Sequence, residues 1–172
     1  MPATAQNPAA TGVVPVAAPE SRCFHCGLPN PPGRRWRAEI VGVEQTFCCA
    51  GCLAVAQTIH AAGLDGFYAA RTAALAKPDE RHHDDEWVRY DESAAAAGLV
   101  RALPDGRAET SLLLEGLTCG ACVWLIESWL VRQPGIEKAQ VNFATRRATV
   151  AWRAGETRLS AVLRAVAAVG YR

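Results

Sequence analysis

Seven cysteines in two groups are the residues of this 172-residue chain whose type and spacing could do chemistry. The earlier group joins Cys23-Phe-His-Cys26 to Cys48-Cys49-Ala-Gly-Cys52, and the later group is the pair Cys119-Gly-Ala-Cys122. Thiolates are soft donors that favour Cu(I) and other d¹⁰ ions over Mg²⁺ or Ca²⁺. The sequence therefore predicts metal ligation, and the candidate ligands are Cys23, Cys26, Cys48, Cys49, Cys52, Cys119 and Cys122.

The pair Cys119 and Cys122 stands between an expected strand and the start of an expected helix. Unpaired backbone N–H groups and the positive end of the helix dipole favour thiolate over thiol at such a place. Two thiolates three positions apart can converge on one ion, whereas zinc prefers four ligands. The pair therefore indicates a carrier site for Cu(I), an ion that accepts low coordination and can be handed on by thiolate exchange.

A redox function is the main alternative for this pair. A C-x-x-C at the start of a helix is also the signature of thiol-disulfide oxidoreductases. That chemistry usually needs a larger sheet and a proline loop facing the cysteines, and the only proline after Cys122 is Pro134, which more plausibly ends the helix. We keep oxidoreduction by Cys119 and Cys122 as the alternative hypothesis.

The earlier cysteine group is typical of a structural metal site. Four thiolates around a turn and a helix start suit a tetrahedral Zn(II), and a small unit gains folding free energy from such an ion. The expected ligands are Cys23, Cys26, Cys52 and one of Cys48 or Cys49, with Cu(I) as the alternative ion. A zinc-finger interaction module is the reading from another class, but the basic cluster 34–37 is a very small footprint for nucleic acid.

Composition and patterning divide the chain into four parts. Residues 1–21 are rich in Ala, Pro and Thr without a hydrophobic period, which predicts a disordered tail. A cysteine-rich metal-binding unit is expected over 22–76, and a polar linker or loosely packed bridge over 77–108. Residues 109–172 form the last unit. The linker holds His82-His83 and a run of acids, which we interpret as a solvated charge run.

Periodicity predicts an α+β chain in two units. The first unit should be a small zinc-ribbon or treble-clef-like fold, with a strand-like run, a helix that stops near Gly63 and a short second helix. The second unit reads strand, helix, strand, strand, helix, with its second and third strands paired as a hairpin. The expected elements are strands 36–47, 110–117, 136–143 and 148–152, and helices 53–63, 66–75, 122–133 and 159–169.

The overall composition excludes several classes. A formal net charge of +1 gives no field that would attract nucleic acid or an anionic membrane. The longest stretch free of charged and polar residues, 94–100, falls far short of the roughly 18 to 20 apolar residues that span a bilayer. We expect no membrane span in this chain and no secretory leader, hence a reducing cytoplasmic compartment in which the cysteines are thiols or ligands.

The second unit resembles the heavy-metal-associated (HMA) domain of copper ATPases and copper chaperones. The resemblance rests on Gly116-Leu-Thr-Cys-Gly-Ala-Cys122, on Pro134-Gly135-Ile136 and on the run Val141-Asn-Phe-Ala-Thr145. Leu117 stands where the family usually has Met, a swap of similar volume. The resemblance implies a ferredoxin-like βαββα(β) fold that lacks its last strand here, because the chain stops at Arg172 where that strand should begin.

The first unit resembles the cysteine-rich domain that precedes the HMA domain in copper P-type ATPases serving haem-copper oxidase assembly. The matching motifs are Cys23-Phe-His-Cys26-Gly27, Phe47-Cys-Cys-Ala-Gly-Cys52 and Gly66-Phe-Tyr68 with Arg71 behind it. The resemblance implies a Cu(I)-binding and transfer region of a Cu(I)-exporting ATPase. Its partners would be a copper chaperone or a glutathione-bound Cu(I) donor, and the remaining ATPase domains.

The chain alone is not expected to be an enzyme. It contains no D-K-T-G phosphorylation motif and no nucleotide site, so we assign no catalytic residue and no organic cofactor. On this interpretation it binds and delivers the metal but does not hydrolyse ATP.

Overall fold

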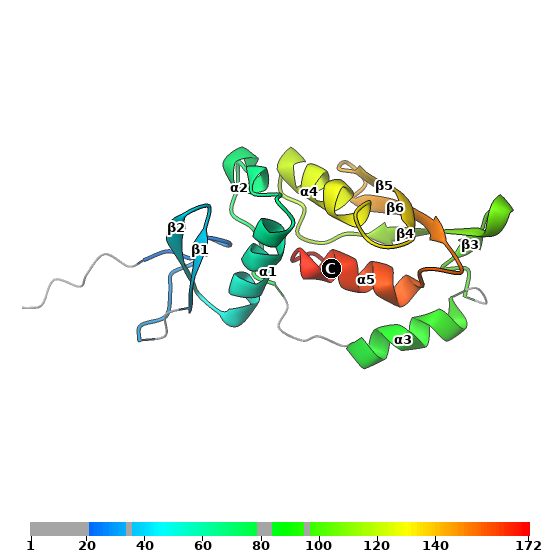
Figure 1. Ribbon diagram of the computed structural model, residues 1–172, viewed down its shortest axis with the longest axis horizontal. Helices are drawn as coiled ribbons and strands as arrows, with labels where there is room; N and C mark the ends of the chain where they lie inside the picture. Colours follow the sequence, from blue (N-terminus) through cyan, green and yellow to red (C-terminus); the bar gives the residue numbers. More distant parts are fainter. Residues whose placement is uncertain (1–20, 34–35, 79–83, 95–96) are drawn as a thin grey trace, which may run out of the picture.

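The computed structural model describes residues 21–33, 36–78, 84–94 and 97–172. It is an α+β structure in which a cysteine-rich half lies beside a half built on a four-stranded sheet (Figure 1). This confirms the expected fold class. Three expectations lie wholly or mostly outside the described residues: the tail 1–21 except for Ser21, the basic residues Arg34-Arg35, and the His82-His83 run.

In the cysteine-rich half, a hairpin and a helix carry the metal-binding segments. Strands β1 (Trp36–Ile40) and β2 (Val43–Phe47) pair antiparallel with Trp36 opposite Phe47. The single run expected over 36–47 is divided by a turn in which Val41 and Gly42 both have positive φ. Helix α1 (Ala50–Ala61) packs against this hairpin through residues at helical spacing, and Gly63 follows it with φ +65°.

The short helix α2 (Gly66–Ala70) ends five residues earlier than the periodicity predicted. Arg71 has extended backbone angles, φ −66° and ψ 136°, so the chain leaves the helix there and crosses toward the other half. Phe67 is completely buried on the one turn that does form. The expected helix over 66–75 is therefore too long.

The second half has the expected strand, helix, strand, strand, helix order. Its elements are β4 (Arg107–Leu113), α4 (Gly120–Leu130), β5 (Ile136–Asn142), β6 (Arg147–Arg153) and α5 (Leu159–Ala168). The sheet order is β3-β4-β6-β5, and the β5–β6 hairpin is antiparallel as predicted. Helices α4 and α5 lie on the same face of the sheet (Figure 1). Strand β3 (Arg101–Ala102) pairs with β4 on its outer edge, and the 3₁₀ turn Pro104–Gly106 joins them.

The turn from α4 into β5 requires glycine. Gly135 has φ +74°, and a Cβ there would lie 2.6 Å from Thr157 Oγ1 and 2.9 Å from the Glu156 Cβ. The Thr157 hydroxyl approaches this closely because it donates a hydrogen bond to the Pro134 carbonyl. The Pro-Gly step therefore ends α4 and also seats the loop that begins α5.

The segment expected as a loose linker contains a packed helix. Helix α3 (Asp84–Ser93) lies along α5 (Figure 1). The Asp91 carboxylate accepts hydrogen bonds from the Ser160 backbone N–H at 2.8 Å and from the Ser160 hydroxyl at 2.7 Å. Because the N-cap residue of α5, Arg158, makes no side-chain cap, Asp91 supplies that cap from α3. The expectation of a loose bridge is therefore wrong for this segment.

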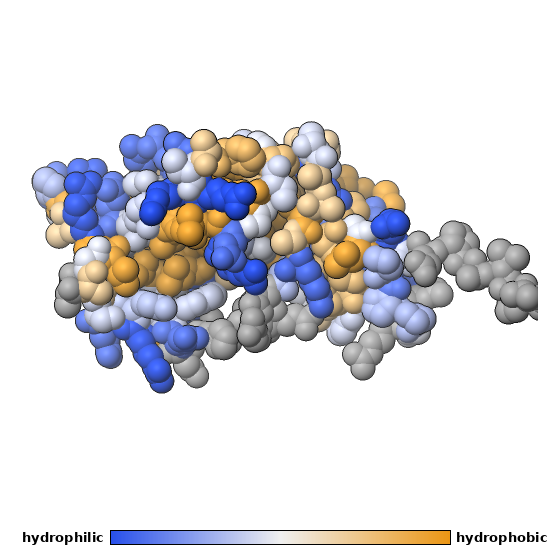
Figure 2. All heavy atoms as spheres, turned by 180° about the vertical axis from the view of Figure 1, so that it is seen from behind, coloured by the Kyte–Doolittle hydropathy of each residue, from blue (hydrophilic) through white to orange (hydrophobic). Residues whose placement is uncertain are grey.

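The two halves share one hydrophobic core. Val55, Phe67 and Leu75 of the cysteine-rich half belong to the same buried cluster as Leu117 and Leu125 of the other half. Arg132 donates a hydrogen bond to the Ala62 carbonyl across the boundary. Figure 2, which views the molecule from behind Figure 1, shows apolar residues gathered on the middle of that face with hydrophilic side chains around them.

Two tryptophans of α4 lie off the core stripe, as their spacing indicates. Trp129 donates its indole N–H to the Ala165 carbonyl of α5 at 2.7 Å, so it packs within its own half. Trp124 is 44% exposed and lies 3.9 Å from the point where Gly66 would carry a Cβ, beside the other half. Among the described residues, no helix is both long and apolar enough to cross a bilayer.

Candidate metal centres

Four cysteines of the first group converge on one point. The Sγ atoms of Cys23, Cys26, Cys48 and Cys52 all lie within 4.8 Å of one another. Cys48 Sγ is 3.6 Å from Cys26 Sγ and 3.6 Å from Cys52 Sγ. The thiols of Cys23, Cys26 and Cys52 are buried, and that of Cys48 is half-buried.

Three local structures place these thiols. Cys23 and Cys26 lie on a tight turn closed by hydrogen bonds from Gly27 N–H to the Cys23 carbonyl and from Cys23 N–H to the Leu28 carbonyl. Cys48 directly follows strand β2, whose end is held to the turn by the Phe24 N–H bond to the Thr46 carbonyl. Cys52 lies in the first turn of α1. The hairpin and the helix start therefore bring the second cysteine group onto the first.

The sequence left open whether Cys48 or Cys49 joins the cluster, and the structure brings Cys48 into it. Cys49 is the N-cap of α1, and its Sγ accepts a hydrogen bond from the Cys52 backbone N–H at 3.4 Å. This bond holds its side chain in the cap position, outside the group of four. Cys49 stands three residues before Cys52, directly ahead of the apolar helical pattern of α1. That spacing is the signal by which the sequence could have indicated the cap.

The four thiols interact strongly before any ion is bound. A hydrogen bond with Cys52 lowers the pKa of Cys23, whereas the same bond and burial raise the pKa of Cys52. Burial raises the pKa of Cys48 as well. An ion that takes all four sulfurs must therefore displace protons from thiols whose pKa is raised.

The geometry fits zinc. A Zn–S distance of about 2.3 Å places the sulfur atoms of a tetrahedron about 3.8 Å apart. The measured separations of 3.6 Å are close to that edge length, and the remaining separations are at most 4.8 Å. Small side-chain adjustments would complete the site. His60, which also lies in the cysteine-rich half, contacts Asp65 Oδ1 at 2.7 Å instead of the cluster.

The later pair forms a two-sulfur site at the start of α4. Cys119 is the N-cap of that helix, and its Sγ lies 3.8 Å from Cys122 Sγ. The Thr118 hydroxyl lies 3.4 Å from Cys122 Sγ. Burial raises the pKa of the Tyr171 phenol, and the neighbouring Cys122 thiol adds to that rise. Both thiols are buried, with 9% of Cys119 and 0% of Cys122 exposed.

Backbone N–H groups favour the thiolate of Cys119. Burial alone would raise its pKa, but the backbone N–H groups of Thr72, Cys122 and Ala121 outweigh that effect and lower the pKa to about 7. Two of these donors belong to the first turn of α4, as the helix-start argument predicts. Thr72 comes from the cysteine-rich half, which sequence reasoning did not foresee.

A buried polar group lies on the turn that carries Cys23 and Cys26. His25 is 1% exposed, and its Nδ1 lies 3.1 Å from the Tyr68 hydroxyl. Burial, helped by the charge of Arg71, lowers the pKa of His25 to about 4, so the ring is neutral. The sequence analysis gave His25, Tyr68 and Arg71 only as residues of the matching motifs. Their roles could not be foreseen because they depend on contacts across 43 to 47 positions.

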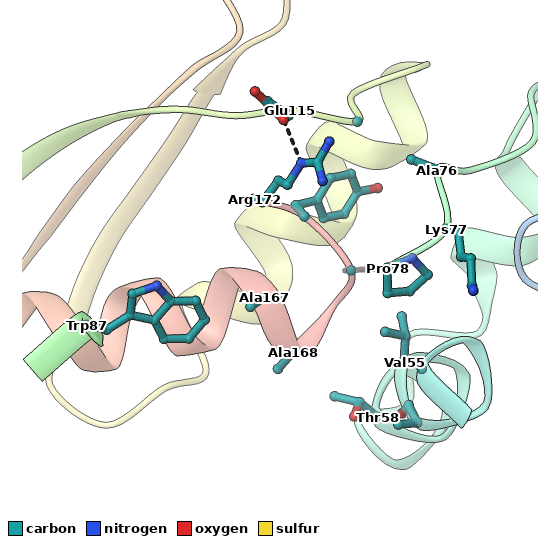
Figure 3. Close-up of a pocket in the computed structure, with 15 residues that line it drawn as sticks. Val55, Thr58, Ala76, Lys77, Pro78, Trp87, Glu115, Ala167, Ala168 and Arg172 are labelled. Carbon is teal, nitrogen blue, oxygen red and sulfur yellow. Dashed lines mark hydrogen bonds and ion pairs between the residues drawn. The ribbon is translucent and has the colours of Figure 1, made fainter. Parts of the chain in front are cut away.

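The clearest cavity is a cleft between the halves. It has a volume of about 330 Å³ and lies between α1 and α5, with Val55 and Thr58 on one wall and Ala167 and Ala168 on the other (Figure 3). The ion pair of Glu115 with Arg172 lies at its edge. No cysteine lines this cleft, so it is separate from both sulfur sites.

Comparison with known proteins matches both halves. Residues 22–103 match the family described as "Putative metal-binding domain of cation transport ATPase", and residues 111–172 match the heavy-metal-associated domain. Over 64 residues the chain is 44% identical to Copper-transporting ATPase 2 of Rhizobium meliloti, covering 37% of this chain and 8% of that protein. It is 36% identical over 63 residues to the Copper-exporting P-type ATPase of Bacillus subtilis, again 37% of this chain and 8% of that protein.

A solved structure is also similar. The solution structure of a copper form of CopA from Bacillus subtilis is 33% identical, with 41% of this chain and 92% of that chain covered and a TM-score of 0.37. The sequence matches to the two ATPases span only a small part of those relatives.

The fold and the two sulfur sites define a heavy-metal-binding protein. A ferredoxin-like domain carries a C-x-x-C pair at a helix start, and a four-cysteine domain precedes it. The chain is a heavy-metal-binding region of the kind found in copper-transporting P-type ATPases.

Proposed function

We propose that this region binds Cu(I) at Cys119 and Cys122 and passes it to, or regulates, the pump of a copper-transporting P-type ATPase. The donor in this proposal is a copper chaperone or a glutathione-bound Cu(I) pool, and the region faces the cytoplasm. In this proposal the parent ATPase belongs to the group that serves haem-copper oxidase assembly, and the motifs of the first half support that membership.

The observation that carries the proposal is the pair of sulfurs 3.8 Å apart at the start of α4. Two converging thiolates without a third cysteine suit Cu(I), which accepts low coordination. In the transfer, Cys119 forms a bond to Cu(I) while one bond to a donor thiolate breaks, and Cys122 then displaces a second donor ligand. Copper stays in the +1 state, and the released donor thiolates take up the protons that the two thiols lose.

The four-cysteine cluster is proposed as a resident structural site for Zn(II). Cys23, Cys26, Cys48 and Cys52 would hold the ion, which cross-links the Cys23–Cys26 turn to the start of α1. Four soft ligands in a near-tetrahedral arrangement support this assignment. Cu(I) at the same cluster is the alternative, since thiolates also favour that ion.

Metal stoichiometry of the intact, reduced chain tests these proposals. We expect native mass spectrometry of anaerobically purified protein to show one bound zinc and one added copper per chain. Cys119→Ser and Cys122→Ser should each abolish the added copper and leave the zinc. The matched control is Cys49→Ser, which removes a thiol that caps α1 and should change neither count.

Other outcomes would move the assignment. Copper binding that survives in Cys119→Ser and Cys122→Ser would refute the pair as the carrier site. Two coppers and no zinc would make both centres copper sites. A Cys119–Cys122 disulfide that forms readily, with no copper uptake after reduction, would favour the oxidoreductase alternative.

A further inference from the structure

A segment of the cysteine-rich half covers the Cys119–Cys122 pair. This covering segment, residues 71–76, connects α2 to the chain that leads out of the first half. Its Leu75 lies in the same buried cluster as both cysteines. Ala76 Cβ is 3.7 Å from the point where Gly116, in the loop leading to Cys119, would carry a Cβ. The low exposure of Cys119 and Cys122 therefore depends in part on residues 71–76, which lie more than forty positions earlier in the sequence.

The covering segment also influences the Cys119 thiol. The backbone N–H of Thr72 is one of the groups that lower the pKa of that thiol. Any ligand exchange at Cys119 must bring a donor sulfur close to this sulfur, which is 9% exposed. The covering segment therefore restricts the approach of a donor protein to the pair.

Arg71 holds the covering segment to the turn that carries Cys23 and Cys26. Its Nη1 donates to the His25 carbonyl and its Nη2 to the Phe24 carbonyl, each at 2.5 Å. The guanidinium also lies over the Tyr68 ring at 4.9 Å and over the Phe24 ring at 5.5 Å. Both acceptor carbonyls belong to residues between the two cysteines, so the turn must keep its shape for Arg71 to bind both.

We propose that residues 71–76 form a lid over the Cys119–Cys122 pair, and that zinc at the four-cysteine cluster holds this lid closed through Arg71. The inference rests on the proposed function and adds regulation to it. Zinc fixes the Cys23–Cys26 turn and with it the two carbonyls that Arg71 binds. Loss of zinc frees that turn, Arg71 loses its paired acceptors, and the lid opens.

A lid of this kind sets how readily copper is taken up. The apparent affinity of a site falls in proportion to the fraction of molecules in which it is accessible. Zinc occupancy of the first centre therefore lowers the rate and the apparent affinity of copper loading at the second. A copper donor that contacts the lid and displaces Arg71 would load the pair faster than a free small thiol complex.

The test is the alkylation rate of Cys119 in the full chain, zinc-loaded and free of copper. Iodoacetamide is the probe, and peptide mass spectrometry resolves the cysteines. We expect Arg71→Ala to raise the rate about tenfold or more, because it removes two charge-assisted hydrogen bonds that hold the lid. The matched control is Arg132→Ala. It removes an arginine-to-carbonyl bond between the two halves but does not touch the lid, so its Cys119 should be alkylated at the wild-type rate.

Zinc removal from the wild-type chain provides a second arm that needs no substitution. Chelation should raise the Cys119 rate to a level similar to that of Arg71→Ala, and added zinc should restore the slow rate. This arm decides the question if Arg71→Ala fails to fold, which its zinc content would reveal.

Three results would contradict the proposed lid. The first is a wild-type Cys119 alkylation rate in zinc-loaded Arg71→Ala, and the second is a rise in Arg132→Ala equal to that in Arg71→Ala. The third is a Cys119 alkylation rate in the wild-type chain that zinc chelation leaves unchanged. None of these measurements uses copper. Failure of the wild-type chain to bind one Cu(I) at the pair would refute the proposed function instead, so the two failures are distinguishable.

Discussion

Replacement of Asp91 by alanine should destabilise the second half through the start of α5. The Asp91 carboxylate accepts two hydrogen bonds from Ser160, at 2.8 and 2.7 Å, and Ser160 is buried. An N-cap substitution costs about 1 kcal/mol, and a carboxylate near a helix N-terminus adds about 0.3–1 kcal/mol. The Ser160 hydroxyl, left buried without this acceptor, adds about 1 kcal/mol. We therefore expect Asp91→Ala to lower the free energy of unfolding by about 2–3 kcal/mol.

Thermal and urea unfolding of the zinc-loaded chain measure this effect. For a chain of this size, about 2–4 °C of melting temperature corresponds to 1 kcal/mol, so Asp91→Ala should melt about 4–12 °C lower. Glu92→Ala is the control, because it removes the next acid of α3, whose side chain is exposed, and should change stability by less than about 0.5 kcal/mol. Equal melting of Asp91→Ala and wild type, or an equal loss in Glu92→Ala, would refute the tertiary cap.

Three further outcomes are expected. Zinc analysis should show loss of zinc in Cys48→Ser and full zinc in Cys49→Ser, because Cys48 Sγ lies in the four-sulfur group; full zinc in both would contradict this. Gly135→Ala should lower the unfolding free energy by about 2 kcal/mol or more in urea, because its Cβ would meet Thr157 and its φ is positive; wild-type stability would contradict it. The Cys119 alkylation rate should rise with pH around a midpoint of about 7, whereas an ordinary thiol has its midpoint near 8.5. Since the pKa of Cys119 is lower in the folded chain than in the unfolded one, its ionisation stabilises the fold above the unfolded pKa, and this contribution is lost as pH falls through about 7. A midpoint of about 8.5 in the folded chain would contradict the lowered pKa.

The elements of the second half could be predicted because their signals are local. The Pro134-Gly135 stop, the alternation through Val150 and Trp152 and the apolar stripe of α5 each follow from neighbouring residues. The same holds for the convergence of Cys119 and Cys122, since a three-residue spacing at a helix start brings two thiols together without help from distant segments.

The remaining features depend on contacts between distant segments. Helix α3 has a strongly polar sequence, which by itself indicated a linker, and the helix is stabilised by packing on α5. The choice between Cys48 and Cys49 depended on which thiol caps α1. The cover of Cys119 by Thr72 has no local signal, because it requires the position of one half relative to the other.

The two halves match two different families, which meet near residue 108. Because the halves share one core, that meeting point does not divide the chain into two independent folding units. Separation of the chain there would expose the faces of Val55 and Phe67 on one fragment and of Leu125 on the other, all at most 5% exposed in the intact chain. Cooperative units in native proteins follow such buried contacts rather than sequence modules. The intact chain is therefore expected to be more stable than either half alone, and a metal bound in either half stabilises the intact chain by mass action.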